Sequence, residues 1–90
     1  MTTARTVLVA GGNRGIGRSI AEEFVALGHR VAVTVRSGEG PAGTLSVVAD
    51  VTDGESLDRA FAEVEAALGP IEVLVANAGI TRDTLLMRMS

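Results

Sequence analysis

The sequence has no cysteine, tyrosine, tryptophan or lysine. Without cysteine the chain can form neither a disulfide framework nor a thiolate metal site. No apolar run approaches the roughly 18 residues that a membrane-spanning helix needs. Residues 1–6 also lack the basic, apolar and small-residue layout of a secretory signal. Together these absences favour a cytoplasmic protein that neither crosses a membrane nor depends on a metal.

Positive charge is scarce as well. All eight basic residues are arginines, spread along the chain, and the formal net charge is −3. Bulk binding of nucleic acid needs a basic stripe that displaces counterions from the phosphates, so the charge pattern argues against it. A single arginine can nevertheless hold one phosphate through two parallel hydrogen bonds.

Apolar residues, in contrast, make up 47% of the chain. Their spacing alternates between the period of a strand and that of a helix. This pattern predicts four strands (Thr6–Ala10, Arg30–Arg36, Leu45–Ala49 and Ile71–Ala76) and two helices (Gly15 to about Leu27, and Thr52 or Asp53 to Leu68). Either Thr52 or Asp53 can cap the second helix. Residues 80–90 could begin a further helix.

The order of these elements predicts an α/β fold with a doubly wound parallel sheet of Rossmann type. Right-handed crossovers place the first three strands in the order 3-2-1 and the fourth on the far side of the first. Residues 1–90 would then form the amino-terminal half of a single, truncated dinucleotide-binding domain.

Each predicted helix carries an apolar stripe at helical spacing. In the first helix the stripe consists of Ile16, Ile20, Phe24 and Leu27, and in the second of Leu57, Ala60, Phe61, Val64 and Leu68. Gly28 stands where a helix C-terminal glycine belongs.

The stretch VLVAGGNRGIG (Val7–Gly17) places Gly11, Gly12, Gly15 and Gly17 between the first strand and the first helix. A bound diphosphate needs main-chain N–H groups aimed at it and the positive end of a helix dipole behind them. Gly11 would allow a tight turn, Gly15 close approach to the phosphates, and Gly17 close packing of helix and strand. Glycines that merely end a strand are the alternative. The position between a strand and an amphipathic helix favours a dinucleotide site.

The end of the second strand decides which dinucleotide fits. Arg36 stands there with Ser37 next to it, and Arg14 lies within the glycine loop. Arginine at this place accommodates the 2′-phosphate of NADP, whereas a carboxylate would bind the ribose 2′-hydroxyl of NAD. Glu39 is the rival carboxylate, but it lies beyond the strand in a turn. The pattern favours NADP over NAD, and an ordinary surface arginine is the alternative.

Other polar residues follow the remaining strands. Asp50 could accept a hydrogen bond from the adenine amino group or could cap the second helix. Asn77 could fasten the fourth strand to its neighbour or contact a ribose, and Ala78 and Gly79 lack the bulk that would obstruct one. We interpret His29, which follows a helix end, as a surface or helix-terminus residue and not as a catalyst.

Three motifs, AGGNRGIG (Ala10–Gly17), DVTD (Asp50–Asp53) and NAGITRD (Asn77–Asp83), together resemble the short-chain dehydrogenase/reductase family. The longer run NAGITRDTLLMRM is similar to the bacterial 3-oxoacyl-[acyl-carrier-protein] reductases. GHRVAVTVR and DRAFAEVEAALGPIEVLVANAG resemble their actinobacterial, mycolate-pathway members. The likeness covers essentially all of these residues, but only about the first third of such an enzyme.

The resemblance implies NADPH-dependent reduction of a 3-oxoacyl thioester to the 3-hydroxyacyl product in fatty-acid biosynthesis. It also implies an acyl-carrier-protein thioester as substrate and a homotetrameric parent enzyme. The implied cofactor contacts are Gly11, Gly12, Asn13, Arg14 and Ile16 for the phosphates and ribose, Arg36 for the 2′-phosphate, Asp50 and Val51 for the adenine, and Asn77, Ala78 and Gly79 for the nicotinamide-side ribose. Gly15 and Gly17 complete the loop.

The sequence departs from the family pattern at two positions in particular. Ala10 replaces the usual threonine, and Ala76 replaces the first asparagine of the usual N-N-A-G. A threonine hydroxyl would tie the loop to the fourth strand, so its loss is expected to forfeit about 1 kcal/mol. Thr84, where asparagine is common, is a smaller change.

The family's catalytic residues are a serine, a tyrosine that donates the proton, and a lysine that lowers the pKa of the tyrosine. The 90-residue sequence contains neither tyrosine nor lysine. We therefore expect the catalytic residues to follow Ser90 and the 90-residue chain alone to be inactive. An open sheet edge at the fourth strand would leave the 90-residue chain marginally stable and prone to associate with other chains. A non-catalytic NADP-binding or sensing module, or a short-chain dehydrogenase with another substrate class, are the alternatives.

Overall fold

The structure, a computed structural model, describes residues 4–11, 15–50 and 52–76. Its strands form one parallel sheet in the order β3-β2-β1-β4. The elements are β1 (Thr6–Ala10), α1 (Gly15–Ala26), β2 (Arg30–Val35), β3 (Thr44–Val48), α2 (Gly54–Leu68) and β4 (Val73–Ala76). The predicted fold class and strand order are confirmed. The further helix expected over residues 80–90 lies outside the described residues.

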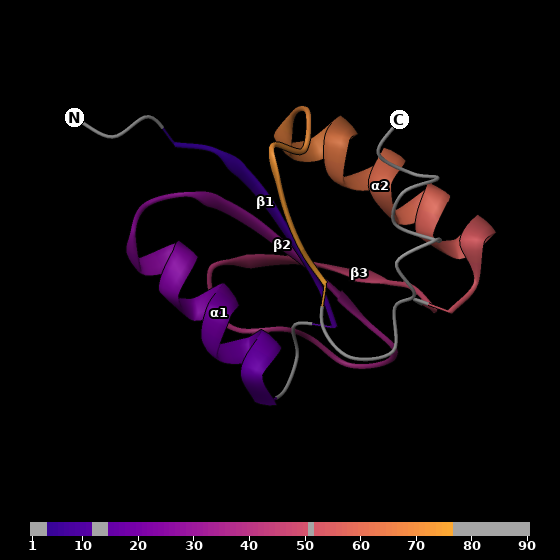
Figure 1. Ribbon diagram of the computed structural model, residues 1–90, viewed down its shortest axis with the longest axis horizontal. Helices are drawn as coiled ribbons and strands as arrows, with labels where there is room; N and C mark the ends of the chain where they lie inside the picture. Colours follow the sequence, from indigo (N-terminus) through magenta and orange to yellow (C-terminus); the bar gives the residue numbers. More distant parts are fainter. Residues whose placement is uncertain (1–3, 12–14, 51, 77–90) are drawn as a thin grey trace.

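Side chains alternate between the two faces of the sheet, and each face is covered by one helix (Figure 1). On one face Val7 and Val9 of β1 pack with Ala21 of α1. On the other face Leu8 of β1 packs with Ala60 and Val64 of α2. Because both faces of the central strands are buried, β1 and β2 are apolar along nearly their whole length rather than alternating.

The predicted apolar stripes of the two helices differ in how deeply they are buried. In α2 the predicted stripe is the buried one: Leu57, Ala60 and Val64 are buried, and Phe61 and Leu68 pack against them from the margin. In α1 the buried residues are Gly17 and Ala21, while Ile16 is 73% and Leu27 61% exposed. The predicted face of α1 is therefore only partly correct, because the small residues Gly17 and Ala21 are the buried ones, while Ile20 and Phe24 are only partly buried against the core.

The termini of both helices lie close to their predicted positions, and the structure decides between Thr52 and Asp53 as the cap at the start of α2. Asp53 caps α2, since its side chain accepts a hydrogen bond from the Glu55 N–H at 3.0 Å. At the end of α1, the Gly28 N–H donates to the Val25 carbonyl and the His29 N–H to the Phe24 carbonyl. These two bonds define a Schellman motif, with Gly28 at its left-handed position.

The connection from β2 to β3 contains no helix. Residues 36–43 instead cross the face of the sheet on which α1 lies. A side chain at Gly40 would collide there with Val33, and one at Gly43 would lie 2.9 Å from Val25 of α1. The Gly40 N–H donates to the Ser46 hydroxyl at 2.8 Å, and the Thr44 hydroxyl donates to the Pro41 carbonyl at 2.6 Å. The loop thus satisfies the polar residues that β3 presents on this face.

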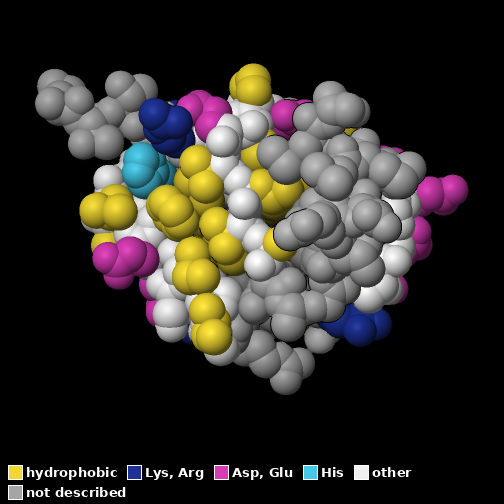
Figure 2. All heavy atoms as spheres, viewed as in Figure 1, with side chains coloured by type: hydrophobic (Ala, Val, Ile, Leu, Met, Phe, Trp, Pro, Cys, Tyr) yellow, Lys and Arg dark blue, Asp and Glu magenta, His cyan; other side chains and the backbone are white. Residues whose placement is uncertain are grey.

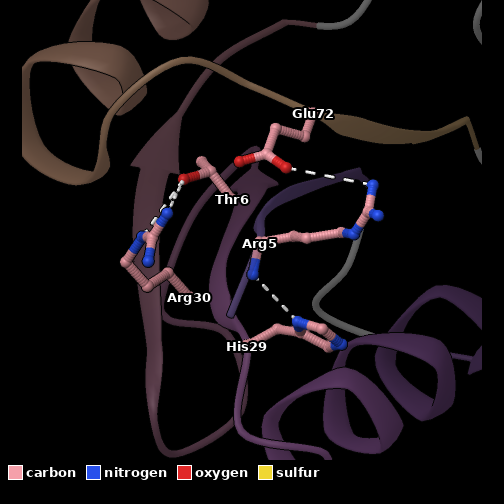
Figure 3. A network of polar contacts seen from close by, with 5 residues as sticks. All are labelled: Arg5, Thr6, His29, Arg30 and Glu72. Atoms are coloured by element: carbon pink, nitrogen blue, oxygen red, sulfur yellow. Dashed lines mark hydrogen bonds and ion pairs between the residues drawn. The ribbon is translucent and has the colours of Figure 1, made fainter. Parts of the chain in front are cut away.

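At the amino edge of the sheet a group of polar contacts joins the starts of β1 and β2 to the end of α2 (Figure 3). The Thr6 hydroxyl donates to the Leu68 carbonyl at 2.9 Å and accepts from the Arg30 guanidinium, which also donates to that carbonyl. His29 Nδ1 accepts from the Arg5 N–H at 3.0 Å. His29 therefore serves the helix terminus, at the edge opposite the carboxyl ends of the strands. Among the described residues, no helix is both long and apolar enough to cross a membrane.

Candidate functional site

The strand order reverses at β1, where the chain first builds outward through β2 and β3 and later adds β4 on the other side. Ligands of such sheets bind outside the carboxyl ends of the strands at this switch point. β1 ends at Ala10, beside Ala76 at the end of β4. The start of α1 lies at the same edge of the sheet (Figure 1). The topology therefore brings the glycine loop and the end of β4 to one place.

The two described ends of the glycine loop have conformations that favour glycine. Gly11 has φ 81° and Gly15 has φ 62°, in the left-handed region that side chains disfavour. At Gly15 a Cβ would meet nothing within 4 Å, so the backbone conformation, and not crowding, requires the glycine. Gly17 is buried in the first turn of α1, as close helix packing predicts. Gly12, Asn13 and Arg14 lie outside the described residues.

The Gly11 N–H is already engaged with the sheet. It donates to Thr34 Oγ1 of β2 at 2.8 Å, and Thr34 is 1% exposed. Sequence reasoning assigned Gly11 to the cofactor site and did not single out Thr34. The available signal was a hydroxyl within an otherwise apolar buried strand, because such a group needs a hydrogen-bond partner.

The two departures from the family pattern are neighbours in the sheet. Ala10 of β1 and Ala76 of β4 face each other in the parallel register. Neither alanine side chain carries a polar group that needs a hydrogen-bond partner at this place. The expected loss of about 1 kcal/mol at Ala10 stays a prediction.

Arg36 and Asp50 supply the charges of this edge. Arg36 follows β2 directly and is exposed, and it has no hydrogen bond or ion pair to any described residue. Asp50 Oδ1 accepts from the Thr52 hydroxyl at 2.6 Å and from the Thr52 N–H at 3.0 Å. These two bonds, with a smaller contribution from the charge of Arg36, lower the pKa of Asp50 below its usual value. Since Asp53 caps α2, the capping role considered for Asp50 is wrong, whereas the adenine role stays open.

Glu39, the carboxylate that would favour NAD, lies elsewhere. With residues 40–46 it lines a hollow of about 410 Å³ that includes the amino half of β3. It therefore does not stand at the strand end where a ribose 2′-hydroxyl would be bound. This placement leaves Arg36 as the charged residue next to the end of β2.

The described residues fit a dinucleotide. Positive backbone φ angles at both ends of the loop suit main-chain contact with a pyrophosphate, and Arg36 offers an exposed cation that makes no hydrogen bond or ion pair with the described residues. Ile16, in the first turn of α1, is 73% exposed. Val51, Asn77, Ala78 and Gly79, which the resemblance assigns to the adenine and the ribose, lie outside the described residues.

Comparison with known proteins points to one family. Residues 5–90 match the family model described as short chain dehydrogenase. The chain is 55% identical over 87 residues to the 3-oxoacyl-[acyl-carrier-protein] reductase MabA of Mycobacterium avium, covering 97% of this chain and 34% of that protein. It is 42% identical over 93 residues to the reductase FabG of Salmonella typhimurium, covering 94% of this chain and 38% of that protein.

The structure of the chain is also similar to a solved protein structure. The ligand-free aldohexose dehydrogenase of Thermoplasma acidophilum superimposes with a TM-score of 0.78 at 36% identity, over 86% of this chain and 30% of that one. The chain therefore spans about a third of the length of the curated relatives and of this solved protein.

Proposed function

The chain belongs to the short-chain dehydrogenase/reductase family, and from this membership we propose that its protein reduces 3-oxoacyl-[acyl-carrier-protein] to the 3-hydroxyacyl product with NADPH. Relatives named as reductases of this substrate support the proposal, as does the family's use of nicotinamide cofactors. The reaction would place the protein in fatty-acid biosynthesis, with acyl carrier protein as its partner and a homotetramer as its assembly.

The observation that carries the proposal is that a glycine turn after β1, at the switch point, and an exposed arginine after the neighbouring strand β2 lie at the same edge of the sheet. The main chain from Gly11 to Gly17 would hold the pyrophosphate, with Asn13, Arg14 and Ile16 contributing from the loop. Arg36 would hold the 2′-phosphate, Asp50 and Val51 the adenine, and residues 77–79 the ribose. The nicotinamide, when bound, supplies the hydride.

Reduction of a ketone also needs a proton donor beside the carbonyl oxygen. The residues of this chain contain no tyrosine and no lysine, which are the donor and its helper in the family. We therefore assign the chain to the cofactor-binding part of the enzyme. The proton would come from residues outside these 90, and the chain alone would be inactive.

The proposal is tested with the protein expressed from its complete reading frame. Acetoacetyl thioester is the substrate, and consumption of NADPH is compared with that of NADH. We expect turnover with a preference for NADPH, and Arg36→Ala should reduce that preference about tenfold or more, because charge-assisted hydrogen bonds contribute ~1.5–3 kcal/mol. Arg59→Ala, which removes an exposed arginine of α2, is the matched control and should leave the preference unchanged.

Three outcomes would reject parts of the proposal. Saturable NADPH binding without turnover would indicate a non-catalytic module. Equal use of NADH and NADPH would reject the role of Arg36. Turnover of another carbonyl substrate, with none of the acetoacetyl thioester, would reject the substrate class.

A further inference from the structure

The Gly11 turn is held by a side chain that the glycine motif does not contain. We propose that Thr34 is a positioning residue whose hydroxyl fixes the start of the glycine loop for the cofactor phosphates. This inference rests on the proposed NADPH site. The proposal stands on the bond from the Gly11 N–H to Thr34 Oγ1, 2.8 Å long, which joins residues 23 positions apart.

Thr34 has the burial expected of a group with a definite partner. The buried polar side chains among the described residues are Thr6 and Thr34, at 0% and 1% exposure. Thr6 bonds at the amino edge of the sheet, where its hydroxyl meets Leu68 and Arg30. Thr34 lies at the carboxyl edge, next to the glycine loop. A buried hydroxyl costs stability unless it is hydrogen-bonded, so its bond to Gly11 is a specific feature of this edge.

The neighbours of Thr34 in the sheet offer no substitute. Thr34 pairs with Val47 of β3, and Ala10 pairs with Ala76 of β4. The register of β1 with β2 runs to Val9 opposite Val33, and one further step places Ala10 beside Thr34. Across this layer of the sheet, Thr34 is thus the residue with a polar side chain. Its removal would leave no other side chain of the layer to accept from Gly11.

The bond has a consequence for the role of Gly11. Because its N–H donates to Thr34, Gly11 serves the site through its turn at φ 81°, and phosphate contacts fall to amides further along the loop. Tying the first residue of the loop to a buried strand limits the conformations that the loop samples. Cofactor binding then has less disorder to remove, and preorganisation of this kind raises affinity.

The experiment uses the protein expressed from its complete reading frame. Thr34→Val keeps the shape but removes the acceptor, and Thr34→Ser keeps the hydroxyl. Thr44→Val is the matched control, because that β3 hydroxyl bonds to Pro41 at 2.6 Å away from the glycine loop. The measurements are the NADPH dissociation constant, the KM for NADPH and kcat with acetoacetyl thioester, the melting temperature, and the hydrogen exchange rate of the Gly11 amide.

We expect Thr34→Val to weaken NADPH binding about tenfold, since the partly buried Gly11 N–H loses the Thr34 acceptor that orients it. KM for NADPH should rise more than kcat falls. Thr34→Ser should restore binding, and Thr44→Val should bind NADPH as the unchanged protein does, even where both valine variants lower the melting temperature. The Gly11 amide should exchange slowly in the unchanged protein and fast in Thr34→Val.

Several results would overturn the inference. Unchanged NADPH affinity in Thr34→Val would do so while leaving the proposed function intact, as would equal weakening in Thr44→Val. Fast exchange of the Gly11 amide in the unchanged protein would exclude the hydrogen bond itself, including in the case where Thr34→Val does not fold. Absence of NADPH binding by the unchanged protein would instead reject the proposed function, and the inference with it.

Discussion

Single hydroxyl and carboxylate groups fix both edges of this sheet. At the amino edge Thr6 connects the Leu68 carbonyl to the Arg30 guanidinium, and at the carboxyl edge Thr34 holds Gly11. At the same edge, Asp50 accepts two bonds from Thr52. Each interaction joins or orders segments that the apolar core alone would leave free to shift.

Replacing Thr6 tests the amino-edge contacts. Thr6→Val should lower the free energy of unfolding by about 1–2 kcal/mol, because Arg30 loses an acceptor and the Leu68 carbonyl loses a donor. Urea denaturation measures the change. Thr6→Ser should recover most of it, and Ser19→Ala, which removes an exposed hydroxyl whose bond is 3.4 Å long, should have almost no effect. Stability equal to that of the unchanged protein in Thr6→Val would show that these bonds contribute nothing net.

The Asp50 carboxyl gives a pH-dependent prediction. The pKa of Asp50 lies below its usual value in the folded protein, so the ionised carboxylate stabilises the fold above the unfolded pKa. That contribution is lost as the pH falls through the lower, folded pKa. Thr52→Val removes the hydroxyl bond, which is the largest cause of the shift, and should raise the pKa of Asp50.

NMR titration of the Asp50 carboxyl carbon measures this pKa directly. Arg36→Ala should raise it by less than Thr52→Val, since the charge of Arg36 is the smallest cause. The reverse ranking would mean that Arg36 lies closer to Asp50 than the structure places it, and would weaken the assignment of Arg36 to the 2′-phosphate of the cofactor.

At the scale of elements, the local pattern of apolar residues predicted the bounds of strands and helices well, but it did not predict which side chains of different elements meet. β1 has the predicted bounds and β2 ends one residue early, because a buried run of branched residues is a strong strand signal. The apolar stripe predicted for α1 is only partly correct, since the periodicity of large apolar residues does not indicate that Gly17 and Ala21 are the buried residues of the helix. Thr34 was missed for a related reason, because its partner is set by the register between β1 and β2.

The start of α2 provides a test of which residue caps the helix, Thr52 or Asp53, since the sequence left both possible. Asp53→Ala should cost about 0.5–2 kcal/mol of stability, because the Glu55 N–H loses its acceptor. Asp53→Asn retains a side-chain oxygen and serves as the control. Urea denaturation followed by circular dichroism measures both. If Thr52→Ala were the more damaging change to helix content, Thr52 would be the cap and the assignment of Asp53 would fail.

At the scale of the whole molecule, an apolar band remains uncovered. Figure 2 shows hydrophobic side chains gathered on the face where α1 and β4 lie. Ile16 and Leu27 of α1 are among the exposed large apolar residues, and Ile20, Phe24, Val73 and Val75 are only partly buried. β4 is also an outer strand of the described sheet. Uncovered apolar surface beside a strand edge favours association with another polypeptide.

This band leads to a prediction for the 90-residue chain. We expect it to self-associate in sedimentation velocity experiments at micromolar concentration. Leu27→Lys should shift the chain toward monomer, because it places a charge within the band. Val48→Lys changes an apolar residue that is 71% exposed on β3 and should leave association unchanged. A monomer with a sharp, reversible melt would instead show that the band is not sufficient for association.

Titration of isotope-labelled protein with NADPH, followed by amide chemical shifts, tests most directly whether the carboxyl edge of the sheet holds the dinucleotide. The predicted result is saturable change concentrated at residues 11–17, Arg36 and Asp50, with the amides of Arg5, His29 and Arg30 at the opposite edge unaffected. Changes confined to that opposite edge, or no saturable change at the glycine loop, would contradict the assignment of this site.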